Sequence, residues 1–275
     1  VHAFDMLELD RKGILAVTMP CFGTTARTKG NAEKLAEAYG VTLETVDIKA
    51  AVDQHFMDIG QSKEDLSVTF ENGQARMRTL VLMNLANKNG GMVVGTGDLS
   101  ELALGWATYN GDHMSMYGVN VSVPKTLARY IIDYEAAQSD ETLAAILNDI
   151  LATPVSPELL PVDEKGEMTQ KTEDLVGPYE LHDFFLYHLM RFGSKPSKIL
   201  RLAEVAFEGI YDREVILEWL KVSYTGWRFS TADFGRSSLN APACLTALRS
   251  APFLSRPAAI GGCPLMRSIT SGRRK

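Results

Sequence analysis

The stretch that decides the fold runs from Val93 to Lys125 and reads VVGTGDLSELALGWATYNGDHMSMYGVNVSVPK. An apolar run over residues 91–94 leads into it and predicts a buried strand. We expect this strand to break at the Gly-Thr-Gly turn of residues 95–97, and a helix to begin near Asp98. This part of the chain therefore predicts a strand, a tight loop and a helix in direct succession.

Side chains that carry chemistry follow this strand closely. They are the hydroxyl of Thr96, the carboxylates of Asp98, Glu101 and Asp112, the aromatic rings of Trp106 and Tyr109, and the amine of Lys125. Ligands of open α/β sheets bind beyond the carboxyl ends of the strands, where loops lead into helices. The set is suited to a nucleotide, its metal ion and a second anionic substrate.

The rest of the chain extends the same α/β pattern. We expect strands at 13–20 and 42–49, and helices at 28–39 and 72–87. Alternating strands and helices indicate a parallel sheet with right-handed crossovers. From residue 123 onward the pattern is mostly helical, with helices expected at 124–137, 139–151, 178–192, 195–206 and 212–223 and a long proline-rich loop over 153–177. Residues 1–9 resemble the end of an amphipathic helix.

Composition excludes several classes of protein. The chain has 275 residues, 45% of them hydrophobic, and a net charge of −6, which disfavours nucleic-acid binding. We find no apolar run of about 20 residues that would span a membrane and no basic segment typical of a signal peptide. The three cysteines have no metal-binding spacing, so we expect a reduced, cytoplasmic setting.

Most candidate site residues also have a purely structural interpretation. Glu101 could bind Mg²⁺ or only favour the positive end of its helix, and Asp98 is typical of an N-cap. Asn72 and Arg76 lie four residues apart on one helix face, where they could bind an anion or face solvent. Lysine at a helix start opposes the helix dipole, which favours a functional role for Lys125.

Other residues carry weaker signals. Trp106 and Tyr109 could stack on a planar ring or belong to the core. His182 has no metal-like spacing to other ligands, and we expect His188 to pack on a helix.

Several segments together resemble one family over residues 1–225. The segments are Thr18-Met19-Pro20, Phe22-Gly23-Thr24-Thr25, Glu71-Asn72, Ala75-Arg76, residues 95–105, residues 109–116, Val123-Pro124-Lys125-Thr126, Ser156-Pro157-Glu158-Leu159 and residues 177–185. They resemble the synthetase domain of glutamine-dependent NAD⁺ synthetases. The resemblance implies an open parallel, Rossmann-like sheet of the adenine nucleotide α-hydrolase type, followed by a mostly helical C-terminal part.

The resemblance also implies a reaction. In it, ATP adenylates the nicotinate carboxylate of deamido-NAD⁺, pyrophosphate leaves, and ammonia attacks the acyl-adenylate to give NAD⁺. ATP and Mg²⁺ are the implied cofactors, and catalysis consists mainly of positioning and charge neutralisation. The family's site lies at a subunit interface, so a homo-oligomer is implied, with no nucleic-acid or membrane partner.

Roles follow from the resemblance residue by residue. Glu101, Asp112 and Lys125 are the implied catalytic residues, and Glu101 is also the implied metal ligand. The implied substrate contacts are Asn72 and Arg76, from the neighbouring subunit, together with Glu101, Trp106, Thr108 and Tyr109. Thr96 and Ser156 resemble the residues that contact ATP.

The chain departs from the family in three places. The family's Ser-Gly-Gly-x-Asp-Ser loop is missing, so we expect the sheet to lack its first strand and to leave two strand edges unpaired. The glutaminase domain, which would supply ammonia, is also missing, and Cys21 is no candidate nucleophile. We therefore expect the fragment to be inactive alone.

The third departure is the tail. Residues 240–275 contain six Lys or Arg and no Asp or Glu. Codons that encode residues 258–267, read one frame over, can give Gly-Asp-Trp-Arg-Met-Pro-Ser-Asp-Ala, a run similar to the family's own ending. We hypothesise a frame slip near residues 226–239, with residues 1–225 a partial synthetase domain and residues 226–275 an unstructured, out-of-frame tail.

Two alternatives remain. The chain could be a different ATP-pyrophosphatase amidotransferase, although those lack the Tyr-Asn-Gly-Asp-His-Met run of residues 109–114. It could also be a truncated, non-catalytic gene product that docks onto a full-length subunit.

Overall fold

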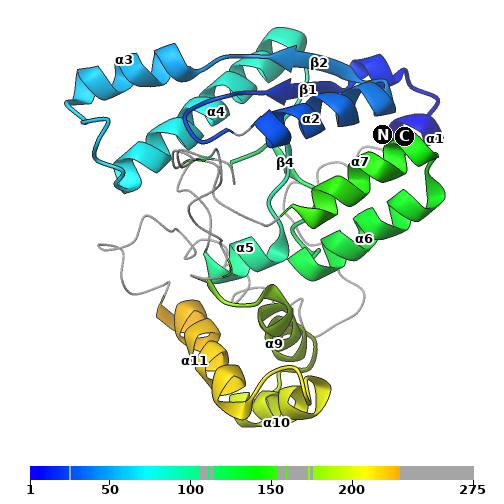
Figure 1. Ribbon diagram of the computed structural model, residues 1–275, viewed down its shortest axis with the longest axis vertical. Coiled ribbons are helices and arrows are strands. Elements are labelled where there is room, and N and C mark those ends of the chain that lie inside the picture. The colour runs from blue at the N-terminus through cyan, green and yellow to red at the C-terminus, as the bar shows by residue number, and fades with distance from the viewer. Residues whose placement is uncertain are drawn as a thin grey trace, which may run out of the picture.

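The structure is a computed structural model that describes residues 1–24, 26–105, 111, 114–153, 159, 173 and 176–229. Its helices surround short strands in the upper part of Figure 1, and a separate group of helices lies below them. In chain order the elements are α1 (His2–Met6), a 3₁₀ turn (Arg11–Gly13), β1 (Leu15–Thr18), α2 (Ala26–Tyr39), β2 (Thr42–Thr45), α3 (Lys49–Ile59), α4 (Val68–Asn89), β3 (Val94–Gly95), α5 (Leu99–Leu104), β4 (Tyr117–Gly118), α6 (Lys125–Gln138), α7 (Glu141–Ala152), α9 (Tyr179–Phe192), α10 (Pro196–Ala206) and α11 (Arg213–Phe229).

The strands form two short parallel ladders. β1 pairs with β2 in the register Leu15↔Thr42, and β3 pairs with β4 in the register Val94↔Tyr117. No hydrogen-bonded pairing joins the two ladders among the strands that the structure describes. The predicted class, a parallel α/β fold followed by a mostly helical part, is confirmed.

Four details of the sequence prediction are wrong. The expected strand 42–49 ends at Thr45, and α3, which no pattern predicted, begins at Lys49 and buries Val52 and Phe56 one turn apart. The buried strand expected at 91–94 is β3 (Val94–Gly95), and it is not buried throughout, since Val94 is 54% exposed. Gly95 itself is buried, and a side chain there would overlap Ser115. β4 was also missed, since two residues are too few to show alternation.

Two hydrophobic clusters stabilise the part of the molecule around the ladders. Phe56 of α3 and Phe70 of α4 bury nearly all of their surface and lie 5.4 Å apart between ring centroids, with the partly buried Phe22 packed against both. Leu143 and Leu147 of α7 form a smaller cluster with α6 and α2. Burial of aromatic rings of this size is among the largest single contributions to a core.

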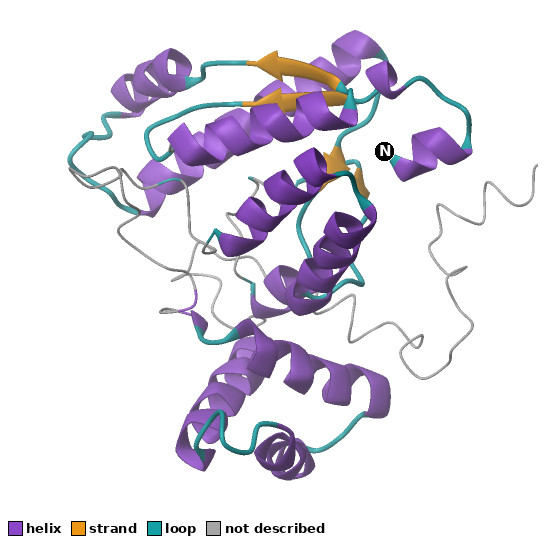
Figure 2. Ribbon diagram, turned by 45° about the vertical axis from the view of Figure 1, so that its right-hand side comes forward, coloured by secondary structure: helices purple, strands orange, loops and turns teal. Residues whose placement is uncertain are grey.

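The helical C-terminal part has its own core. Buried faces of α9, α10 and α11 meet around Phe185, and Ala103 of α5 packs into the same cluster. Figures 1 and 2 show these three helices gathered below the ladders, with α5 between the two regions. Helix α5 therefore belongs both to the strand–loop–helix unit and to the C-terminal core, which fixes its position.

A buried histidine lies inside this core. Both ring nitrogens of His182 have partners, since Nδ1 lies 2.7 Å from Ser223 Oγ and Nε2 lies 2.6 Å from the Val176 carbonyl oxygen. Burial lowers the pKa of His182 below its ordinary value of 6.5. His188 packs on Phe184 at 4.4 Å between ring centroids, as expected from the sequence. None of the helices within the described ranges is both long and apolar enough to cross a lipid bilayer.

Candidate functional site

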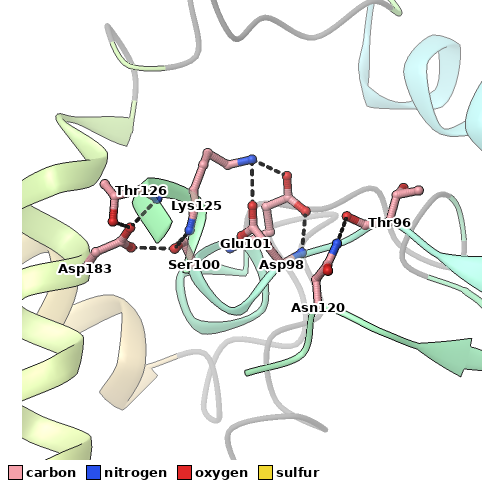
Figure 3. A network of polar contacts seen from close by, with 8 residues as sticks. All are labelled: Thr96, Asp98, Ser100, Glu101, Asn120, Lys125, Thr126 and Asp183. Carbon is pink, nitrogen blue, oxygen red and sulfur yellow. Dashed lines mark hydrogen bonds and ion pairs between the residues drawn. The ribbon is translucent and has the colours of Figure 1, made fainter. Parts of the chain in front are cut away.

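The site forms where the loops after β3 and β4 meet. Because the two strands are parallel neighbours, their carboxyl ends lie at one edge, and each loop leads directly into a helix. The loops are tied together by a hydrogen bond from Leu99 N to the Val123 carbonyl oxygen at 3.0 Å. Asn120 Nδ2 also donates to the carbonyl oxygen of Thr96 at 3.5 Å (Figure 3). The starts of α5 and α6 are therefore held side by side.

Lys125, the first residue of α6, lies between two carboxylates of the α5 start. Its Nζ is 2.8 Å from Asp98 Oδ2 and 2.8 Å from Glu101 Oε1 (Figure 3). The Lys125 side chain is 15% exposed, and those of Asp98 and Glu101 are 7% and 28% exposed. The structure thus brings together three residues that the sequence selected, and Thr96 lies in the same loop.

The two carboxylates also begin the α5 helix. Asp98 is the N-cap and accepts a hydrogen bond from Glu101 N at 2.9 Å, while Glu101 Oε2 accepts one from Asp98 N at 3.2 Å. This reciprocal pair is a capping box, which satisfies two backbone donors at once. The N-cap interpretation of Asp98 is confirmed. For Glu101 one oxygen has the structural role and the other faces the lysine.

Burial and charge set the protonation of this cluster. Burial raises the pKa of Glu101 above its ordinary value of 4.5, and the Asp98 charge adds to this, although Lys125 opposes it. Burial acts to lower the pKa of Lys125, but the Glu101 charge and the hydrogen bonds to both carboxylates outweigh burial and raise it above its ordinary value of 10.5. Lys125 is therefore a permanent cation at neutral pH.

An aromatic ring closes one side of the cluster. Lys125 Nζ lies 5.2 Å from the ring centroid of Tyr179, the first residue of α9, which is 3% exposed. At this distance the ring face attracts the ammonium group. Burial raises the pKa of Tyr179, so its hydroxyl stays protonated at neutral pH.

A second polar group lies on the other side of Lys125, and sequence reasoning missed it. It consists of Ser100, Thr126 and Asp183, with Asp183 contributed by α9 (Figure 3). Asp183 is 7% exposed and Ser100 is fully buried. The available signal was a polar pair, His182 and Asp183, in an otherwise apolar stretch of α9, because buried polar groups require partners.

The predicted substrate contacts on α4 lie elsewhere. Asn72 is 7% exposed and Arg76 is exposed, both on α4, which packs mainly against α3. In Figure 1, α4 lies beside α3, away from α5. The structure thus places these two residues on one helix, as the spacing predicted, but apart from the Lys125 cluster.

Five of the predicted site residues lie outside the described ranges. They are Trp106, Thr108, Tyr109, Asp112 and Ser156. Their roles stay predictions.

The carboxylates near Lys125 carry oxygen atoms, the kind of donor that Mg²⁺ prefers. Among the residues that the structure describes, no group of three or more His, Cys, Asp or Glu side chains could hold a metal ion. Protein-bound Mg²⁺ commonly uses only one or two carboxylates, together with phosphate oxygens and waters. Here all four oxygens of Asp98 and Glu101 have protein partners, so a magnesium ion would bind only by displacing one of these partners.

Comparisons with known proteins identify the family of the chain. A family model described as NAD synthase matches residues 2–212. The chain is 41% identical over 261 residues to the glutamine-dependent NAD(+) synthetase of Mycobacterium leprae (strain TN), covering 86% of this chain and 38% of that protein. The Mycobacterium tuberculosis (strain H37Rv) protein of the same name is 40% identical, with the same coverage.

A solved structure shows the same fold. The glutamine-dependent NAD(+) synthetase of Cytophaga hutchinsonii superimposes with a TM-score of 0.56 at 18% identity, over 77% of this chain and 33% of that chain. The chain spans 38% of the length of the mycobacterial relatives that it matches. Because the family model covers most of the chain and the sequence identity is substantial, this chain belongs to the NAD synthase family.

Proposed function

We propose that the chain contributes the synthetase site of an ATP-dependent amidation that converts deamido-NAD⁺ to NAD⁺. In this reaction a nicotinate carboxylate oxygen attacks the α-phosphorus of ATP and pyrophosphate leaves. Ammonia then attacks the acyl carbon, AMP leaves with the C–O bond electrons, and the nitrogen loses a proton. The observation that supports the proposal is the largely buried cation Lys125, held by two carboxylates at the edge where parallel strands end.

Lys125 is suited to neutralise phosphate charge. Its ammonium group is largely shielded from water, where Coulomb interactions are stronger than in bulk solvent. Asp98 and Glu101 hold it in place before a ligand arrives, so little reorganisation is needed. The aromatic face of Tyr179 restricts it on a further side.

Glu101 is the residue that we propose for Mg²⁺. The ion would supply charge neutralisation on the phosphates of ATP. Glu101 would turn from Lys125 toward the ion, and Asp98 would keep the ammonium group in place.

The substrate side of the proposal extends beyond the described residues. Asn72 and Arg76 would contact deamido-NAD⁺ from a neighbouring subunit of a homo-oligomer, with the exposed Arg76 suited to a phosphate or carboxylate. Trp106, Thr108, Tyr109 and Asp112 would line the nicotinate side, and Thr96 and Ser156 would contact ATP. Ammonia would come from a glutaminase domain.

Calorimetric titration tests the proposal directly. We expect the chain to bind deamido-NAD⁺ in preference to XMP, and Lys125→Ala to weaken binding of ATP with Mg²⁺. Lys63→Ala is the matched control, because Lys63 also pairs with a carboxylate, Asp53 at 2.8 Å, but is 56% exposed. Preference for XMP would favour a different amidotransferase, and no binding of either would favour a non-catalytic product.

Turnover by the chain alone is a separate question. The sequence contains no Ser-Gly-Gly-x-Asp-Ser run for pyrophosphate. We therefore expect negligible NAD⁺ formation from deamido-NAD⁺, ATP, Mg²⁺ and ammonia, measured by an enzymatic cycling assay. Turnover near that of a full-length family member would contradict this expectation.

A further inference from the structure

Asp183 joins three helices at the point where Lys125 begins α6. Its Oδ1 accepts a hydrogen bond from Ser100 Oγ in the first turn of α5. Its Oδ2 accepts two more, from Thr126 N at 2.9 Å and from Thr126 Oγ1 at 2.7 Å. A carboxylate of α9 thus has both oxygens committed to the starts of α5 and α6 (Figure 3).

The start of α6 depends on these bonds because its own N-cap cannot provide them. Pro124 occupies the N-cap position and makes no side-chain cap. The first backbone donors of a helix need partners from outside it. Lys125 N finds Ser100 Oγ at 2.9 Å, and Thr126 N finds Asp183. Helix α6 is therefore capped by groups of two other helices.

The hydroxyl of Ser100 transmits the constraint from Asp183 to Lys125. A hydroxyl has one proton to donate and lone pairs to accept with. Because its proton is directed to Asp183, a lone pair of Ser100 is directed to Lys125 N. The backbone of Lys125 is thereby fixed relative to α5, whose Asp98 and Glu101 hold the far end of the same side chain.

From this geometry we propose that Asp183 is a positioning residue for Lys125, acting through Ser100 and the first turn of α6. Its relevance to ligand binding rests on the proposed function of Lys125, but the positioning itself can be measured without a ligand. The competing interpretation is that Asp183 only anchors α9 to the rest of the fold. If Asp183 positions Lys125, replacing Asp183 in a folded variant should speed proton exchange of the Lys125 ammonium. If Asp183 is only an anchor, that exchange should stay unchanged.

The test is the NMR signal of the Lys125 ammonium in ¹⁵N-lysine-labelled chain. A paired, shielded ammonium exchanges its protons slowly, and Lys125→Ala identifies the signal by its loss. In Asp183→Ala and in Ser100→Ala we expect exchange to accelerate at least about tenfold, the factor that losing a charge-assisted bond implies. Asp183→Asn, whose one acceptor oxygen can serve Thr126 N while its amide donates to Ser100 Oγ, should keep exchange slower than Asp183→Ala does.

Ser223→Ala is the matched control. It removes the hydroxyl that contacts His182, the neighbour of Asp183 on α9, without touching Ser100 or Thr126. It should lower stability and leave the Lys125 signal unchanged. If Asp183→Ala does not fold, the Lys125 exchange rates in Ser100→Ala and Asp183→Asn test the proposal instead. The proposal is overturned if Ser100→Ala or Asp183→Ala folds with Lys125 exchange unchanged, or if Ser223→Ala accelerates it equally.

A ligand arm separates this inference from the proposed function. If both hold, Asp183→Ala weakens binding of ATP with Mg²⁺, and the Lys125→Ala, Asp183→Ala double variant is no weaker than Lys125→Ala alone. If the intact chain binds no ATP while the exchange effect persists, the proposed function fails and the positioning role stands. Additive losses in ATP affinity would instead show that Asp183 does not act through Lys125.

Discussion

Replacing Lys125 by methionine should destabilise the fold by an amount that depends on pH. Methionine has a similar length but no charge, so it leaves the Asp98 and Glu101 carboxylates next to each other without a cation. Removing one partner of a buried ion pair costs about 3–5 kcal/mol. Because Glu101 is 28% exposed and can take up a proton, we expect about 2–3 kcal/mol at pH 8.

The pH dependence follows from Glu101. Its pKa is already raised in the folded protein, and Lys125 is the group that opposes this. Without Lys125 the folded-state pKa rises further, while the unfolded value stays near 4.5. The folded variant then binds more protons than the unfolded chain from about pH 4.5 upward, so its stability falls as pH rises through that window. We expect the penalty to be smaller at pH 5 than at pH 8, because a larger share of Glu101 is protonated at the lower pH.

Urea unfolding followed by circular dichroism at pH 5 and pH 8 measures the loss of stability in the Lys125→Met variant at each pH. Lys63→Met serves as the control, with an expected cost of about 0–1 kcal/mol at either pH, because the Lys63–Asp53 pair is at the surface. A variant as stable as the parent chain at pH 8 would refute the argument. So would a penalty of equal size at both pH values.

Four further predictions concern other parts of the chain. Gly177→Ala should lower the free energy of unfolding by about 2 kcal/mol or more in a urea titration, because Gly177 has φ +92° and an added Cβ would overlap the Trp219 ring. For His182, whose pKa is lowered, thermal midpoints should fall as pH drops below 6.5, since the unfolded chain then binds the extra proton, and His182→Gln should flatten that slope. Asp140→Ala removes the α7 N-cap that accepts from Thr142 N and Leu143 N and should cost about 1 kcal/mol by urea unfolding. Independent sequencing of the gene should reveal a frame slip near codons 226–239, and an intact frame through codon 275 would refute that hypothesis.

Elements with strong local signals were predictable from the sequence. The helices from residue 125 onward were recovered to within a few residues, except α11, which continues to Phe229 instead of ending near residue 223. Helix α3 was missed because its two buried residues, Val52 and Phe56, fit several patterns, and only packing against Phe70 fixes it as a helix. Tertiary context overrode a weak local preference there.

The candidate site was predictable in part. Asp98, Glu101 and Lys125 could be selected because each has chemistry suited to a strand end, and parallel pairing of β3 with β4 brings them together. The pairing of Ser100 with Asp183 could not be predicted, because their bond joins positions 83 residues apart that no spacing rule relates. Contacts of that kind depend on how α9 packs, which a local pattern does not contain.

The double use of Glu101 limits how this region can change. One carboxylate both initiates α5 and faces Lys125, so a ligand that pulls the side chain outward would fray the beginning of that helix. Affinity and helix initiation are therefore coupled through a single residue, and engineering one without the other is difficult. Glutamine would keep the cap but lose the charge, while aspartate would be too short to reach both partners, so tolerance at this position should be narrow.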